Sequence, residues 1–228
     1  MSDFNESEYE VQEWMSLSDI MSGLMLLFLA ISVVFLGNIG KGAVIAGARE
    51  GLGEIMCNQS SLPDEVTCDS TNLTWEFPGD SVNFAQGSDT LTPYFRETLR
   101  NVFPDLIRKL TAENYRCFVK GIRIEGHTND VWEDQTGIEA YSLNMRLSQA
   151  RAASVFDVLV RLDESKNNWE WLEPRLTPNG LSSSALATDS TGRVDNEASR
   201  RVVLRIEMIG KLEEAGENGE DDQCLVGQ

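Results

Sequence analysis

The sequence is short of basic residues and histidine, and these shortages exclude several kinds of site. The 19 Lys and Arg residues are outnumbered by 37 Asp and Glu residues, which gives a net charge of −18. Nucleic acid is not an expected partner, because binding a phosphate backbone needs clustered Lys and Arg side chains. The four cysteines form no C-x-x-C pair and there is one histidine. The sequence therefore predicts no metal site.

Recognisable catalytic patterns are also missing. The chain has no phosphate-binding loop and no pair of carboxylates at a catalytic spacing. No motif places a Ser or Cys nucleophile beside His127, so we expect this histidine to fix its loop through a hydrogen bond. We predict neither an enzyme nor a bound cofactor.

Charge is absent from Ile20 to Leu36. A helix of that length is about 26 Å long, and extending it from Leu17 to Ile39 is enough to cross a hydrocarbon core of roughly 30 Å. We predict a single transmembrane helix within residues 14–40. A secretory signal peptide is disfavoured, because there is no positive segment before the apolar run and no small-residue cleavage site after it.

Asp19 lies at the edge of this apolar run and has two interpretations. It either marks the membrane–water boundary of a plain anchor, or it is an ion or proton site that faces a protein partner, because an ionised carboxylate facing lipid is costly. Small residues favour close packing between membrane helices. Several residues follow Asp19 on one helical face, most of them small: Ser22, Gly23, Leu26, Ala30 and Gly37.

Both ends of the chain are acidic, and we expect residues 1–13 and 211–228 to be solvated, disordered tails. Orientation in the membrane has conflicting signals. Lys41 and Arg49 follow the apolar run, and by the positive-inside rule they would place the N-terminus outside. The cysteines that follow the apolar run point the other way. They favour an oxidising compartment on the C-terminal side of the run, which would place the N-terminus inside.

Residues 41–72 are predicted to be a linker. Its first part, Gly40 to Met56, either continues the helix or forms a short amphipathic piece. Cys57 and Cys68 lie in a segment rich in Ser, Pro, Asn and Asp, and we favour a disulfide between them. Cys117 and Cys224 are then either paired with each other or free.

Residues 73–210 are predicted to form a soluble domain of the α/β class, an α+β sandwich with helices on one face of a mixed sheet. Trp169 and Trp171 are expected to be packing anchors, and Pro104 is expected to kink its helix. Apolar periodicity predicts, in order, a strand and turn within 80–93, a helix over 93–110, a strand over 117–124, a helix over 138–162 and a strand over 200–208.

Four segments resemble the signature blocks of OmpA-like peptidoglycan-binding domains, in the family's order. They are FAQGSDTL at 84–91, GHTND at 126–130, NMRLSQARA at 144–152 and SRRVVLRIE at 199–207. The resemblance spans about Val82 to Met208 and implies that the domain binds the stem peptides of peptidoglycan.

The same resemblance implies which residues bind the ligand. Arg151 would grip a carboxylate with its guanidinium fork, and Asn144 and Leu147 would line the same helix face. The family's loop reads GHTD, whereas here the fourth position is Asn129. Either Asn129 accepts the ligand amine or Asp130 replaces the missing carboxylate. From the residues alone, Arg151 could equally be a surface salt bridge and Asn144 a polar residue on a helix face.

The whole chain resembles MotB-like stator subunits, in which the acid of a WxxxxDxM helix is the ion site. Trp14, Asp19 and Met21 fit that pattern. The resemblance implies an inner-membrane protein with a cytoplasmic N-terminus and a periplasmic domain, against the local charge rule. It also implies H⁺ or Na⁺ as the transported ion, a homodimer, and a MotA-like or ZorA-like multi-helix partner that forms a ring of five around the two copies.

Within this group, LSDIMSGLMLLFLAI at 17–31 and its acidic flanks are more similar to ZorB-type subunits of Zorya anti-phage defence systems than to flagellar stators. Two alternatives remain open. One is a flagellar stator subunit, and the other is a passive peptidoglycan-binding envelope tether in which the helix is only an anchor.

Overall fold

The structure is a computed structural model that describes residues 3–79, 83–85 and 87–210, with the side chains of 3–19 and 37–41 left out. It divides into two compact units, Met1–Val44 and Ile45–Gln228. We describe each unit by itself.

The first unit is helical. Helix α1 (Asp3–Cys57) includes residues 3–13, which were expected to be disordered. Helix propagation adds one hydrogen bond for each further residue that is fixed, so the helix extends from the apolar run into the acidic segment before it. Side chains 20–36 are all exposed. Within the part of the chain whose side chains are described, no helix meets the length and apolarity that a membrane crossing requires. The side chain of Asp19 and the tail 211–228 lie outside the described residues.

The last three turns of α1 belong to the folded unit, which begins at Ile45 and not at Leu73 as the sequence suggested. Leu52 and Met56 are completely buried in the hydrophobic core. They are four residues apart and therefore share one face of the helix. Part of the predicted linker is thus a structural element of the domain, in agreement with the alternative that the helix continues.

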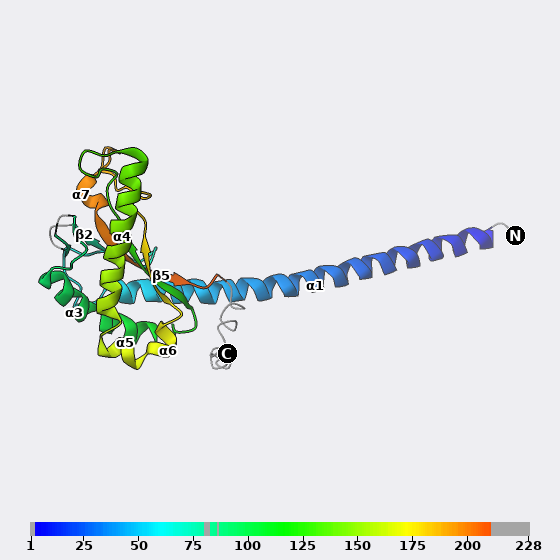
Figure 1. The fold of residues 1–228 in the computed structure, drawn as a ribbon. Helices are drawn as coiled ribbons and strands as arrows, with labels where there is room; N and C mark the ends of the chain where they lie inside the picture. The colour runs from blue at the N-terminus through cyan, green and yellow to red at the C-terminus, as the bar shows by residue number, and fades with distance from the viewer. Residues whose placement is uncertain (1–2, 80–82, 86, 211–228) are drawn as a thin grey trace. The chain divides into compact units, whose positions relative to one another are not determined.

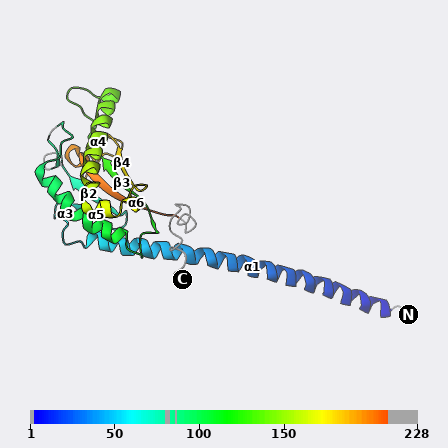
Figure 2. The ribbon, with the colours of Figure 1, turned by 60° about the horizontal axis from the view of Figure 1, so that its bottom comes forward.

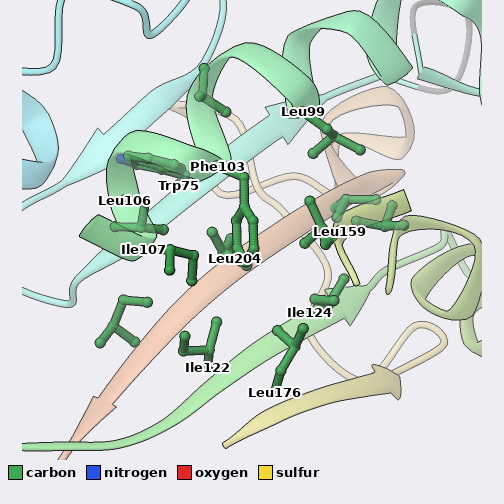
Figure 3. Close-up of a cluster of buried hydrophobic side chains, with 14 of the residues drawn as sticks. Trp75, Leu99, Phe103, Leu106, Ile107, Ile122, Ile124, Leu159, Leu176 and Leu204 are labelled. Carbon is green, nitrogen blue, oxygen red and sulfur yellow. The ribbon is translucent and has the colours of Figure 1, made fainter. Parts of the chain in front are cut away.

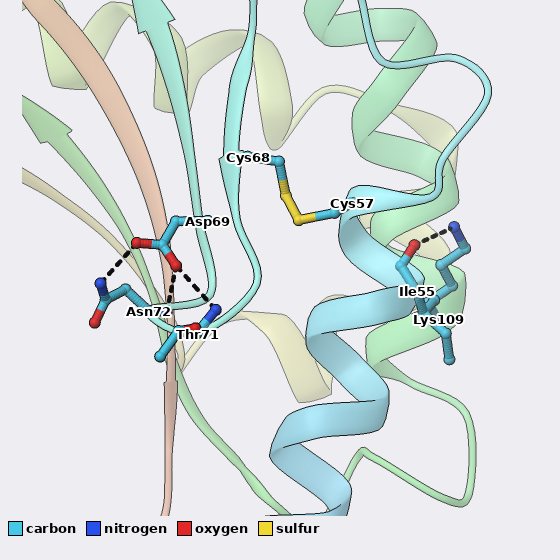
Figure 4. Close-up of a disulfide and its surroundings, with 7 residues drawn as sticks. All are labelled: Ile55, Cys57, Cys68, Asp69, Thr71, Asn72 and Lys109. Atoms are coloured by element: carbon cyan, nitrogen blue, oxygen red, sulfur yellow. Dashed lines mark hydrogen bonds between the residues drawn. A yellow bond between two sulfur atoms is a disulfide. The ribbon is translucent and has the colours of Figure 1, made fainter.

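Several contacts hold this end of α1 in place. Cys57 forms a disulfide with Cys68, the pairing favoured from the sequence, and Lys109 Nζ donates a hydrogen bond to the Ile55 carbonyl at 3.2 Å (Figure 4). A Cβ atom at Gly53 would lie 2.2 Å from the Ser70 carbonyl oxygen. Glycine is therefore required for this close approach. Cys224, the candidate partner of Cys117, lies outside the described residues.

The sheet is mixed, as predicted. Strands β3 and β4 are parallel and the other neighbours are antiparallel. Its five strands lie in the order β1 (Thr67–Asp69), β2 (Thr74–Pro78), β5 (Arg201–Met208), β3 (Val119–Gly126) and β4 (Leu176–Gly180).

Helices α3 (Pro93–Leu110) and α4 (Gly137–Leu159) pack against one face of the sheet (Figures 1 and 2). Their apolar residues and those of the strands form a single core. Phe103 of α3, Leu159 of α4 and Leu204 of β5 all belong to it (Figure 3). The Thr92 hydroxyl caps α3 by accepting from the Phe95 N–H at 3.1 Å. Pro104 lies inside α3 without ending it.

Other parts of the domain differ from the prediction. In the described residues 83–85 and 87–92 there is an isolated bridge between Phe84 and Leu91 and no named strand, while residues 80–82 and 86 of the predicted strand lie outside the described residues. Three short helices are added: α5 (Asp163–Asn167), α6 (Trp169–Leu172) and α7 (Asn196–Ser199). Trp171 is buried and its indole N–H donates to the Arg116 carbonyl at 3.3 Å. It is a packing anchor, as expected.

Candidate functional site

Helix α4 lies very close to the ends of two strands. Gly126 ends β3 and Gly180 ends β4. A Cβ at Gly126 would lie 2.2 Å from the Ser148 carbonyl oxygen, and one at Gly180 would lie 2.5 Å from the Gln149 nitrogen. Both glycines are needed because α4 packs backbone to backbone against the strand ends. The loop after β3 therefore begins beside the middle of α4.

Backbone hydrogen bonds fix the loop that follows β3. The His127 N–H donates to the Arg201 carbonyl at 2.9 Å, and the Thr128 N–H donates to the Ser182 carbonyl at 3.0 Å. The Ser182 hydroxyl donates to the Tyr141 carbonyl of α4 at 3.0 Å. His127 thus holds its loop through its main chain, and its buried ring lies 3.6 Å from the Glu125 carboxylate.

An open pocket of about 540 Å³ lies between this loop and α4. Its lining includes four of the five residues predicted to bind the ligand, namely Asn129, Asn144, Leu147 and Arg151. Asp130 is exposed and is not part of the lining. Of the two loop residues considered from the sequence, the geometry therefore brings only Asn129 to the pocket.

Arg151 is a built-in part of this pocket and not a surface residue. Its side chain is 2% exposed. Its Nε donates to the Ser88 carbonyl at 3.0 Å, and its guanidinium carbon lies 4.9 Å from the centre of the Phe84 ring. A guanidinium over an aromatic face is held by a cation–π interaction. Phe84 and Ser88 therefore hold the side chain of Arg151 in place.

Two further polar groups in the lining differ in their role. Asn144 is buried and its side-chain amide donates to the Val131 carbonyl at 3.2 Å, so it positions the loop. The Thr128 hydroxyl is buried and has no hydrogen-bond partner among the described residues. An unsatisfied buried hydroxyl costs roughly 1–3 kcal/mol. A ligand that bonds to this hydroxyl would recover that free energy.

Glu133 is a pocket residue that the sequence reasoning did not single out. It lies in the segment VWEDQTG at 131–137, where Trp132 and Gln135 exchange two backbone hydrogen bonds of 3.3 and 2.8 Å. Glu133 takes a left-handed backbone, with φ 50°, at this tight turn and lines the pocket. It is an acidic residue in the lining of the same pocket as Asn129, which occupies the position of the family's acid. No local signal distinguishes it from the neighbouring Asp134.

A partly buried ion pair lies next to the loop, with Glu125 buried and the Arg205 side chain 37% exposed. Arg205 donates to both carboxylate oxygens of Glu125, at 2.9 and 3.2 Å. Burial alone would raise the pKa of the Glu125 carboxyl, but His127 and Arg205 outweigh burial and lower that pKa from 4.5 to about 2. Glu125 is therefore ionised at neutral pH and has a structural role.

Comparisons with known proteins show what the chain is similar to. Two proteins named Zorya protein ZorB are similar to the chain. The one from Escherichia coli strain ATCC 8739 is 29% identical over 220 residues, covering 91% of this chain and 93% of that protein. The one from Escherichia coli O139:H28 is 24% identical over 217 residues, covering 89% and 83%.

Among solved structures, a MotB-like protein from Desulfovibrio vulgaris has a TM-score of 0.50 and 22% identity, and it covers 74% of this chain and 95% of that one. This likeness concerns the fold. Residues 83–200 match the OmpA family. That match covers half of the chain and includes every element around the pocket, so the chain belongs to the OmpA family.

Proposed function

We propose that this chain anchors a membrane complex to peptidoglycan, as a subunit of the stator type. The observation that carries the proposal is the pocket that combines the buried guanidinium of Arg151 with the carboxylate of Glu133. Stem peptides of peptidoglycan carry carboxylate and amine groups together. An arginine fork pairs with a carboxylate, and an acidic side chain pairs with an amine.

The remaining lining suits the same ligand. Arg200 adds a second cation, the amides of Asn129 and Asn144 add neutral polar groups, and Leu147 adds an apolar surface. The buried Thr128 hydroxyl offers a further hydrogen bond to the ligand. This is a binding site, and no catalytic step is proposed for it.

Pull-down with purified peptidoglycan sacculi tests the anchoring role. Arg151→Lys keeps the charge but loses the planar fork, so we expect the bound fraction to fall about tenfold. Arg151→Ala should abolish binding. Arg146→Ala is the control, because Arg146 is exposed on the same helix outside the pocket. Circular dichroism would verify that each variant is folded. Unchanged sacculus binding in both folded Arg151 variants would overturn the role of this pocket.

The membrane part of the proposal concerns residues 14–40, which we propose cross the inner membrane with the N-terminus in the cytoplasm. Support comes from the exposed apolar side chains of residues 20–36. The Cys57–Cys68 disulfide also supports an oxidising compartment after the helix. The folded domain would then be periplasmic.

Asp19 is the proposed site for the transported ion, H⁺ or Na⁺. Two copies of the chain would stand within a ring of five MotA-like or ZorA-like subunits, where protein shields the carboxylate from lipid. The similarity to two ZorB proteins supports a role of this kind in Zorya defence, ahead of a flagellar stator.

Asp19→Asn tests this role. The variant should assemble with its partner but lose ion-driven activity, whereas Asp19→Glu should retain part of the activity because it keeps the carboxylate. Proton flux in vesicles and survival of phage infection would measure the effect. Full proton flux and full protection in Asp19→Asn would rule out Asp19 as the ion site.

A further inference from the structure

A second charged pocket lies on the domain and is not used by the function proposed above. It is open, has a volume of about 480 Å³, and contains three guanidinium groups, from Arg96, Arg100 and Arg161. Two carboxylates, from Asp89 and Asp157, also line it. Three arginines in one pocket are notable in a chain whose net charge is −18.

The two pockets follow one face of helix α4. Asn144, Leu147 and Arg151 of α4 line the first pocket, and Ser154 and Val158 of α4 line the second together with Arg161, which lies two residues beyond the end of the helix. These positions are separated by alternating steps of three and four residues, which keep side chains on the same side of a helix. The second pocket therefore continues the first along α4.

The pockets also share a wall. Gly87 lines the first pocket and Asp89 lines the second. Ser88 lies between them, and its carbonyl accepts the hydrogen bond from Arg151 Nε at 3.0 Å. The arginine proposed to bind the ligand in the first pocket thus also holds the segment that separates the two.

The spacing of the pockets suits a peptide. Leu147 lines the first pocket and Val158 lines the second, and they are eleven positions apart on α4, which corresponds to about 16 Å at 1.5 Å per residue. An extended peptide covers roughly 3.3 Å per residue. About five residues would reach from one pocket to the other.

The arginines of the second pocket remain available to a ligand. Arg96 and Arg100 are one turn apart on α3 and both are exposed, although like charges at this spacing repel each other. Arg100 has a 3.8 Å contact with the exposed Glu97, and Arg161 Nε donates to the Asp157 carbonyl at 3.0 Å. In the described part of the chain, Arg96 has no ion pair within 4.0 Å.

We propose that this pocket is a second subsite for a carboxylate-bearing stem peptide, so that the domain binds a cross-linked pair of stem peptides. The inference rests on the proposed peptidoglycan binding. The three guanidinium groups would bind a carboxylate of the second peptide, and Asp89 and Asp157 would pair with an amine of the same peptide. The ligand would lie along α4 from one pocket to the other.

Two purified fragments of peptidoglycan distinguish one subsite from two: a monomeric muropeptide and a cross-linked dimeric muropeptide. Their binding to the full chain in detergent would be measured by calorimetry. The unaltered chain should bind the dimer about tenfold more tightly than the monomer, because a second contact on one ligand adds to the first. Arg96→Ala/Arg100→Ala should bind the dimer only as tightly as the monomer. Arg146→Ala is the control and should keep the preference.

Each other outcome overturns the second subsite in a recognisable way. A double variant that still prefers the dimer would show that these arginines take no part. Equal loss of monomer and dimer binding in the double variant would show an effect on the first pocket only. If the unaltered chain binds neither fragment, the proposed function fails and the second subsite fails with it.

Discussion

Glu125 shows how a single residue beneath the site sets the domain's response to pH. Its carboxyl has a pKa of about 2 in the folded chain against an ordinary value of 4.5. A group whose pKa is lowered by folding stabilises the folded state when it is ionised. This contribution is complete above about pH 4.5 and is lost as the pH falls towards 2.

Glu125→Gln should therefore lower the free energy of unfolding at pH 7 by about 2–3 kcal/mol, since it leaves the Arg205 guanidinium without its charged partner. The difference between variant and parent should shrink steadily between pH 4.5 and pH 2. Urea unfolding across this range would measure it.

Glu207→Gln is the control, because Glu207 pairs at 3.0 Å with Arg123, which is 47% exposed. Exposed pairs contribute less than about 1 kcal/mol. A Glu125→Gln effect that stays constant with pH would contradict the assigned role of the charge.

The residues proposed to bind the ligand differ in how far the sequence could predict them. Asn144, Leu147 and Arg151 lie in one block on one helix face, so a local pattern located them. Glu133 reaches the pocket only through a turn that gives it a left-handed backbone. Phe84 and Ser88 contact Arg151 across more than sixty residues of sequence. These partners depend on the tertiary fold, which no local pattern reports.

Among the elements, the end of α1 includes a close approach that can be tested by a single substitution. Gly53 packs against the Ser70 backbone, whereas a Cβ at Gly47 of the same helix would meet nothing within 4 Å. The two glycines thus form a matched pair in one helix.

Gly53→Ala should destabilise the domain by about 2 kcal/mol, because the added methyl group would force backbone to shift. Gly47→Ala should instead stabilise it by about 0.5–1 kcal/mol, as expected for alanine in a helix interior. Thermal unfolding of the two variants would measure both effects. Equal effects would mean that α1 does not pack closely at Gly53.

The predicted elements agree best where the pattern is strongly periodic. Helix α3 has the predicted bounds, and α4 and β5 begin and end within three residues of theirs. Strand β4 was missed because its sequence, LTPNG, has few apolar residues and contains Pro and Gly. Strand β1 is three residues long and is held by its neighbour β2 and the disulfide. Short elements of this kind are determined by tertiary contacts.

At the scale of the whole molecule, the foldable unit is longer than the OmpA match. Leu52, Met56 and Val66 belong to the core. They precede the match, which begins at residue 83, and also the domain start predicted from the sequence, residue 73. Their burial contributes roughly 1.5–3 kcal/mol each for the larger side chains.

A chain that begins at Ile45 should therefore unfold cooperatively, whereas one that begins at Leu73 should lose most of its stability. The shorter chain lacks these core residues, β1 and the disulfide, which alone contributes about 3 kcal/mol for a loop of this length. Near-ultraviolet circular dichroism and urea unfolding of both chains would compare them. Equal unfolding midpoints would show that the end of α1 is dispensable.

The disulfide also has a mechanical consequence. If the chain anchors a motor to the wall, tension enters the domain through α1. At Cys57 the covalent bond to Cys68 carries that load directly into strand β1. The intervening residues 58–67 are bypassed and carry no tension. Pulling on the helix therefore loads the sheet, and this segment cannot be drawn out until the sulfur–sulfur bond is broken.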